Sequence, residues 1–149
     1  FLVLEAATTA AARAVPPLGT VLGGAIGFDP DPPRAHGLRA AVQAALRQAG
    51  IAASQLGAIV RGAPPSLRTA EARLLAELVE GTDTQVLPVK NHLGETFGAA
   101  GPLGLLVALH ALAPGGVALL LDVCGTGHAA VLVVRREAGP LPGPVPTPP

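Results

Sequence analysis

Residues 90–104, KNHLGETFGAAGPLG, decide how the rest of the chain is interpreted. They follow a strand-like run, residues 84–89 (TQVLPV), and lead into an apolar segment that ends near Leu112. This order predicts a strand, a turn and the start of a buried helix. The run GAAG at residues 98–101 is unfavourable in an isolated helix, because each Gly costs about 1 kcal/mol relative to Ala. Its presence indicates that a second backbone, or a symmetry mate, approaches this helix closely.

This stretch resembles a motif of the β-ketoacyl-acyl-carrier-protein synthases, which have the thiolase fold. In that family a Lys-Ser pair is followed after two or three residues by Gly-His and then by Gly-Ala-Ala-Gly. Lys90, Gly94 and residues 98–101 match this pattern. Asn91 replaces the usual Ser, and Glu95 stands where the resemblance places the catalytic His.

The resemblance extends in order over residues 2–135. A second family motif, a strand followed by His-Gly-Thr-Gly-Thr and then by a helix with Glu-Ala, is matched from the strand-like run LGAIV at residues 56–60 onward. Arg61 stands at the place of the His, and Glu71 and Ala72 match the helix. The resemblance implies an α/β protein with the second, C-terminal half of a thiolase fold, in which helices are layered around a mixed sheet.

The replacement of His by Glu95 has a calculable effect. In the resembled enzymes this His donates a hydrogen bond to a thioester carbonyl that becomes negative during decarboxylative condensation. An ionised Glu95 about 4 Å from this carbonyl would repel its negative charge and raise the activation free energy by about 4 kcal/mol, at an effective dielectric of about 20. The condensation rate would then fall about a thousandfold. A protonated Glu95 could donate, but burial would have to raise its pKa well above about 4.3. The favoured interpretation is that Glu95 caps free N–H groups at the start of a helix.

Arg61 and Lys90 are the other family-matched ionisable residues. An Arg can donate to an oxyanion or clamp a malonyl-type carboxylate, but it cannot exchange protons at neutral pH. We favour a salt bridge between Arg61 and Glu95, which would replace a catalytic pair by a structural one. Lys90 is expected to hold Glu95 or a backbone carbonyl. No catalytic residue is therefore expected at these three positions.

Strands and helices alternate along the chain, which predicts an α/β class with a largely buried sheet. Strands are predicted at residues 1–5, 19–28, 56–60, 84–89, 116–123 and 129–135. Helices are predicted at residues 6–14, 37–49, 71–79 and from the GAAG run to residue 112, with a loop at residues 29–33 (DPDPP). Residues 1–136 are interpreted as one ketosynthase-like C-terminal domain, and the Pro-rich residues 137–149 as an extended tail.

The composition excludes several classes of function. Ten basic residues balance ten acidic ones and the only aromatic residues are three Phe, so nucleic-acid binding has no electrostatic or stacking support. No apolar run reaches the length of a membrane span. Half of the residues are hydrophobic and only 13% are charged, which indicates that much of the surface is hidden in a partner or in a missing half of the fold. A start at Phe1 indicates a segment of a longer polypeptide, or a processed or split product.

The single cysteine, Cys124, lies near His128 in the sequence. Sequence proximity is not the geometry of a nucleophilic pair, and the resembled family carries its nucleophilic Cys in the N-terminal half. We expect a buried structural thiol and a cytoplasmic setting without internal disulfides. The four His are not spaced as metal ligands with Cys or carboxylates, so neither a metal nor a cofactor is expected.

Three functions remain open. The first is a non-catalytic subunit or half-domain, similar to the chain-length-factor partners that pair with an active ketosynthase and shape its acyl tunnel in fatty acid or polyketide biosynthesis. Its implied partners are a ketosynthase-like subunit or the missing N-terminal half, in a homo- or heterodimer, and an acyl carrier protein. The second is the C-terminal half of an active β-ketoacyl-acyl-carrier-protein synthase, an acyltransferase whose Cys lies in another segment. The third is an unrelated α/β binding domain. We rank the first highest, because both family His positions are replaced.

Overall fold

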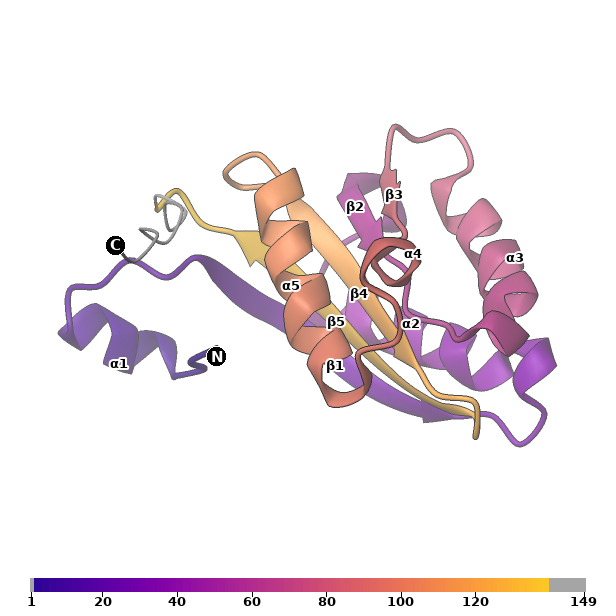
Figure 1. Ribbon diagram of the computed structural model, residues 1–149. Helices are drawn as coiled ribbons and strands as arrows, with labels where there is room; N and C mark the ends of the chain where they lie inside the picture. The colour runs from indigo at the N-terminus through magenta and orange to yellow at the C-terminus, as the bar shows by residue number, and fades with distance from the viewer. Residues whose placement is uncertain (1, 140–149) are drawn as a thin grey trace.

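Five strands form one mixed sheet in the order β1-β5-β4-β2-β3 (Figure 1). The computed structural model describes residues 2–139. The strands are β1 (Gly19–Phe28), β2 (Leu56–Val60), β3 (Gln85–Leu87), β4 (Val117–Val123) and β5 (His128–Arg136). Strand β2 is parallel to β3 and β4, whereas β5 is antiparallel to both β4 and β1. Four strands therefore run in one direction, and β5 alone runs against them.

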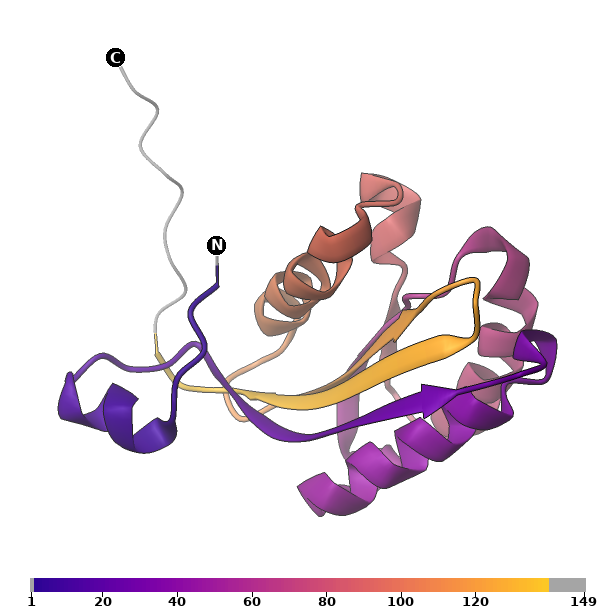
Figure 2. The same ribbon diagram turned by 90° about the horizontal axis from the view of Figure 1, so that it is seen from below.

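Helices cover the two faces of the sheet unequally (Figure 2). The α-helices are α1 (Ala7–Ala12), α2 (His36–Ala49), α3 (Arg68–Val79), α4 (Val89–Leu93) and α5 (Ala100–Ala111). Short 3₁₀ turns are η1 (Pro32–Arg34), η2 (Ala53–Gln55), η3 (Pro65–Leu67) and η4 (Phe97–Ala99). Helices α2 and α3 share one hydrophobic core with the sheet, and α5 packs over β4 and β2 to form a second core. The layers are thus helix, sheet and helix.

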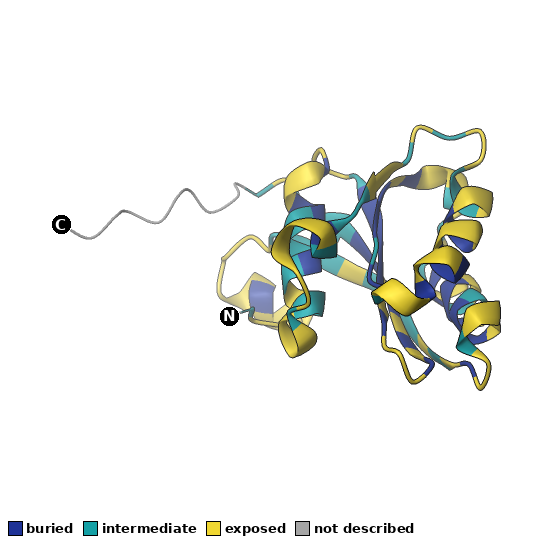
Figure 3. Ribbon diagram, turned by 45° about the vertical axis from the view of Figure 1, so that its right-hand side comes forward, coloured by how far each residue is buried: buried dark blue, intermediate teal, exposed yellow. Residues whose placement is uncertain are grey.

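The apolar periodicity explains how α2 lies on the sheet. Its buried residues include Leu38, Val42, Ala45 and Leu46, which recur on one face of a helix. Gly50 ends the helix with φ 66°, a left-handed conformation that Gly adopts without steric cost. Figure 3 shows the dark-blue buried stripe of this face turned toward the sheet.

The face of the sheet that carries α5 is covered only in part. Ile26 and Phe28 of β1 are 83% and 57% exposed, and Leu132 of β5 is 39% exposed. Gly27, between Ile26 and Phe28, faces α2, because a Cβ there would overlap the backbone of Gly37. Side chains alternate along a strand, so Ile26 and Phe28 point away from α2. We call Ile26, Phe28 and Leu132 the open sheet face.

Most of the predicted elements are confirmed, but the first strand is wrong. Residues 2–6 form no strand, and Val3 and Leu4 are 69% and 78% exposed. An apolar run becomes a strand only beside another strand, and no described strand lies next to it. In Figure 1 the segment is the N-terminal end of the chain and lies beside α1, outside the sheet.

The bounds of one predicted strand and one burial prediction also differ. The predicted strand at residues 84–89 is shorter, because Pro88 has no N–H for a ladder and Val89 begins α4. Helix α5 is not a buried helix, since only Gly104, Ala108 and Leu109 of its residues are buried. Its other residues are half-buried or exposed, and one of them, Leu105, lines a hollow together with Leu2, Val3 and Leu4.

The C-terminal boundary is tied to β1. The Glu137 carboxylate accepts a hydrogen bond from the Thr20 hydroxyl at 2.7 Å, and the Glu137 N–H donates to the Leu18 carbonyl. Residues 140–149 of the predicted tail lie outside the described residues, so the division at residue 136 stays a prediction. Within residues 2–139 no helix combines the length and the apolar character needed to cross a membrane.

Candidate functional site

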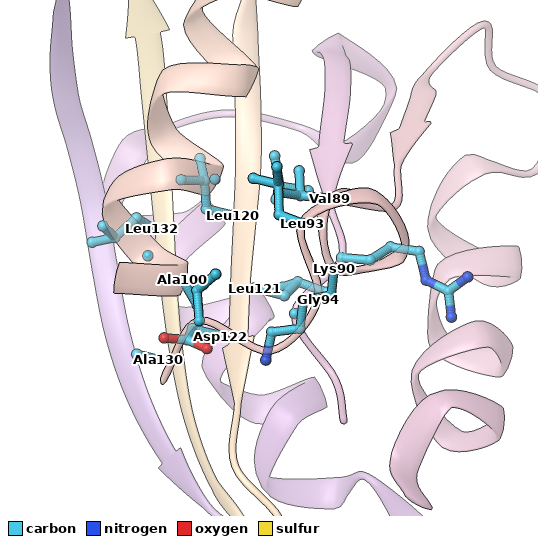
Figure 4. Close-up of a pocket in the computed structure, with 16 residues that line it drawn as sticks. Val89, Lys90, Leu93, Gly94, Ala100, Leu120, Leu121, Asp122, Ala130 and Leu132 are labelled. Carbon is cyan, nitrogen blue, oxygen red and sulfur yellow. The ribbon is translucent and has the colours of Figure 1, made fainter. Parts of the chain in front are cut away.

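A pocket of about 120 Å³ opens at the carboxyl ends of β2 and β4, beside α4 and the start of α5 (Figure 4). Carboxyl ends of neighbouring parallel strands meet at one edge of a sheet, where α/β proteins commonly bind ligands. The wall is mostly apolar, with charged residues at its rim; the lining includes Val60, Val89, Leu93, Leu120, Leu132, Arg61, Lys90 and Asp122. The structure therefore brings two of the three predicted site residues, Arg61 and Lys90, to one pocket.

Arg61 is held by a buried carboxylate on α3. Its Nε donates to Glu71 Oε2 at 3.0 Å, and Glu71 is 1% exposed. The other carboxylate oxygen accepts the N–H groups of Gly62 at 2.9 Å and Ala63 at 3.0 Å. Glu71 thus fixes both the direction of Arg61 and the path of the backbone that leaves β2.

Glu95 pairs with Lys90. The Lys90 ammonium lies 3.0 Å from Glu95 Oε2, and Glu95 Oε1 accepts the N–H of Phe97 at 3.1 Å, at the start of η4. The hydrogen bond from Lys90 and then that from Phe97 lower the pKa of Glu95. Glu95 is therefore ionised at neutral pH and cannot act as the protonated donor considered from the sequence.

The predicted salt bridge between Arg61 and Glu95 is wrong. Arg61 pairs with Glu71, and Glu95 pairs with Lys90. The reason is that α3 turns back along β2 and places the Glu71 carboxylate against the first residues after the strand. The Lys90–Glu95 pair expected as one role of Lys90 is present. Glu95 accepts one N–H group, that of Phe97, but it lies before α5 and does not cap that helix.

Asp122 is a pocket residue that the sequence analysis missed. It ends the apolar part of β4 and lines the pocket. Partial removal from water raises the pKa of Asp122, the Lys90 charge lowers it and the Glu95 charge raises it. The sequence signal for Asp122 is its position as a single carboxylate directly after the apolar run LLL at residues 119–121.

Replacing Lys90 by Gln is expected to raise the pKa of Glu95 toward its ordinary value, because the main hydrogen bond to the carboxylate is lost. In the wild-type protein the lowered pKa contributes stability above the ordinary Glu pKa, and this contribution is lost as the pH falls through the lowered value. The measurement is an NMR titration of the Glu side-chain carboxyl carbons. Glu77, whose pKa is lowered by Arg39, is the internal control and should titrate as before. An unchanged Glu95 titration would contradict the pairing.

The small-residue run at residues 98–101 is not explained by packing against any other part of residues 2–139. A Cβ on Gly98 would meet nothing within 4 Å, and one on Gly101 would meet only Asp122, at 3.8 Å. Gly104, one turn further, packs against Val60, where a Cβ would lie 3.1 Å from the side chain. The predicted close approach at residues 98–101 is made by no described segment, and it stays a prediction about a partner.

The prediction that Cys124 is buried is wrong, because the thiol is exposed on the turn between β4 and β5. Its Sγ lies 2.9 Å from the Thr126 hydroxyl, which is 3.3 Å from His128 Nδ1. The hydrogen bond with Thr126 lowers the pKa of Cys124. Cys124 does not line the pocket. Among residues 2–139, no group of three His, Cys, Asp or Glu side chains is arranged to hold a metal ion.

Comparisons with known proteins place this geometry among ketosynthases. The family model described as the C-terminal domain of β-ketoacyl synthase matches residues 19–123. The structure of the ishigamide ketosynthase/chain length factor is 28% identical, with a TM-score of 0.62 over 87% of this chain and 38% of its own. The ketosynthase ApeO in complex with its chain length factor ApeC, from Xenorhabdus doucetiae, is 22% identical, with a TM-score of 0.66 over 82% of this chain and 40% of its own.

A third similar structure is a type II polyketide synthase acyl-carrier protein in complex with its ketosynthase, AntDE:AntF. It is 15% identical, with a TM-score of 0.72 over 89% of this chain and 42% of its own. This chain thus spans less than half the length of these solved chains. A search among curated proteins found no match.

Proposed function

Because the chain belongs to the family of β-ketoacyl synthase C-terminal domains, we propose that it is a non-catalytic, chain-length-factor-like half of a ketosynthase assembly. In this role it supports acyl chain condensation in fatty acid or polyketide-type biosynthesis. The observation that carries the proposal is that Arg61 and Glu95, at the two family His positions, are each held in an ion pair.

The charges at these positions support a structural role. Glu95 is ionised, so it would repel the negative charge that develops on a thioester carbonyl during condensation. Arg61 already donates its Nε to Glu71 and cannot exchange protons at neutral pH. Lys90 neutralises Glu95, and the two residues form the second ion pair at the site. Each polar group thus supports the loops around the pocket.

The open sheet face supports the proposal of a ketosynthase-like partner. Leu132 of this face lines the pocket, and Ile26 pairs with Ala130, which also lines it. Leu93, the last residue of α4, and Phe97, the first residue of η4, are 50% and 82% exposed. Exposed apolar side chains at this density favour a protein interface over a free surface. We propose that the other half of the fold, or a partner subunit, covers them and that the pocket forms part of an acyl channel served by an acyl carrier protein.

A second function has one observation in its favour. Lys90, the residue that matches the family motif, lines the pocket beside Asp122. This arrangement fits the C-terminal half of an active β-ketoacyl-acyl-carrier-protein synthase, an acyltransferase whose Cys nucleophile would be supplied by another segment. The two functions predict opposite results when Lys90 or Glu95 is replaced.

The test uses the native protein purified with everything that remains bound to it. Lys90→Ala and Glu95→Gln are expected to leave the condensation rate of the assembly within about a factor of three, because neither group contacts the reacting atoms. Arg39→Ala, which removes a surface ion pair, is the matched control. A fall of about 100-fold or more with unchanged assembly would assign a transition-state role and favour the active enzyme.

The intact mass of the native protein separates the two assemblies. A mass near 14.7 kDa together with a larger ketosynthase-like companion supports a separate partner subunit. A larger single polypeptide makes these residues one half of a complete fold. Its other half should then be searched for a Cys at a strand-to-helix turn.

A further inference from the structure

A hollow of about 830 Å³ lies between the N-terminal segment and the body of the protein. One wall is formed by α1 and the residues on either side of it, and Figure 2 shows α1 standing apart from the sheet. The other wall belongs to the body, where β1, α5 and β5 contribute Val21, Leu105, Leu109 and Val134. No described residue lines both this hollow and the pocket at Lys90. The volume is in the range of ligand-binding clefts, so the hollow has room for a peptide segment.

The walls of this hollow are almost uncharged. Among the described residues that line it, only Glu5 and Arg13 carry a charge, and they pair with each other. Val3 and Val21, on opposite walls, are 69% and 47% exposed. Covering apolar surface stabilises a protein by about 25 cal/mol for each Å² that leaves water. The hollow therefore favours an occupant that is apolar and carries no charge.

The described part of the chain ends at the rim of the hollow. The Glu137 N–H donates to the carbonyl of Leu18 at 3.0 Å, and the Glu137 carboxylate accepts a hydrogen bond from Thr20 at 2.7 Å. Both Leu18 and Thr20 line the hollow. Gly139 lies against Pro16, another lining residue, because a Cβ on Gly139 would be 3.3 Å from the Cβ of Pro16. The residues that follow Gly139 are thus attached at this rim.

The sequence after Gly139 has the composition that the hollow favours. Residues 140–149 read PLPGPVPTPP, with six Pro and no charged residue. A Pro-rich sequence favours the polyproline II helix, which advances about 3.1 Å per residue and needs no internal hydrogen bonds. A segment with this preference loses little conformational entropy when it docks. Because these residues are tethered at the rim, their effective concentration at the hollow is on the order of millimolar.

We propose that residues 140–149 of this chain bind in the hollow and that Leu141 and Val145 pack on its body wall, which includes Leu105 and Leu109. The point of attachment, the length and the lack of charge favour this segment over the tail of a second copy, which would arrive without the tether. The inference goes beyond the proposed function, because it holds whether or not the chain takes part in catalysis. A partner that packs on this wall has to displace the tail first.

The test is paramagnetic relaxation enhancement in NMR spectra of the full-length protein. Cys124→Ser removes the one native thiol, and Thr147→Cys then carries a nitroxide spin label. The methyl signals of Leu105 and Leu109 are expected to lose most of their intensity relative to the same sample with the label reduced. The methyl signals of Leu74 are the internal control and should keep their intensity, because Leu74 lies in the other hydrophobic core, with α2 and α3.

A matched pair of variants tests the apolar contact. In the spin-labelled chain, Leu141→Ser combined with Val145→Ser should restore the signals of Leu105 and Leu109, whereas Pro149→Ser at the end of the tail should leave them broadened. A mixed sample, in which the spin label and the isotope label are on different chains, reports the tail of a second copy.

Full intensity at Leu105 and Leu109 in the spin-labelled chain would overturn the inference. So would equal broadening at Leu74, no recovery in the double variant, or a loss of intensity in the mixed sample as large as in the single chain. No condensation assay is involved, so the result stands apart from the test of the proposed function.

Discussion

Replacing Glu71 by Ala is expected to destabilise the protein by about 3–5 kcal/mol, the range for removing one partner of a buried ion pair. The substitution leaves the N–H groups of Gly62 and Ala63 without an acceptor in a buried place, and each orphaned group costs about 1–3 kcal/mol. The guanidinium of Arg61 loses its only described partner at the same time.

The measurement is urea denaturation of the full-length protein followed by circular dichroism, because the chain has no Trp or Tyr for fluorescence. Glu71→Gln, which keeps the volume and one acceptor oxygen, should lose less stability than Glu71→Ala. Glu77→Ala is the control on the same helix; its pair with Arg39 is exposed to solvent, so the loss should be far smaller than at Glu71. Equal losses at Glu71 and Glu77 would show that the buried carboxylate is not the anchor of this loop.

Gly62→Ala is expected to have the second largest effect, a loss of about 3 kcal/mol, at the upper end for overpacking. A Cβ on Gly62 would lie 2.6 Å from the carbonyl carbon of Leu121 and 2.8 Å from the Cα of Asp122. Both are backbone atoms of β4, so no side chain can move aside and the end of β2 must shift. The same shift would displace Arg61 and reshape the pocket.

The control for this substitution is Gly125→Ala in the turn after β4. A Cβ there would meet nothing within 4 Å, so the change in the free energy of unfolding should stay within about 0.5 kcal/mol. Both variants can be compared by the midpoint of thermal unfolding. A midpoint for Gly62→Ala that equals that of Gly125→Ala would contradict the close approach of the two strands.

The sequence predicted the fold well in segments where apolar residues recur with the period of a helix or a strand. The alternation of strands and helices, the amphipathic α2 and the GAAG stretch led to a thiolase-like α/β half with a mixed sheet, and the family match and the structures confirm it. Strands β1 and β2 have the predicted bounds. Prolines flank β1 on both sides in the sequence, and Gly62 follows soon after β2.

Contacts between distant segments could not be predicted in the same way. The sequence placed Arg61 and Glu95 at matching family positions but carried no signal that α3 would direct Glu71 back to the end of β2. Residues 2–5 have the composition of a strand, yet strand formation depends on a neighbour that residues 2–139 do not supply. Cys124 has the residue type of a buried thiol, but its position on a turn exposes it.

The pairing of β1 with β5 determines when this protein can finish folding. Gly19 pairs with Arg136 and Phe28 pairs with His128, so β1, the first strand, can pair only after β5, the last strand, has been made. Contacts between such distant residues slow folding. During synthesis β1 can pack on α2, but β1 has no paired strand until β5 has left the ribosome, and an unpaired strand edge favours aggregation in that period. A chaperone, or a segment made earlier on the same polypeptide, would protect β1 during that interval.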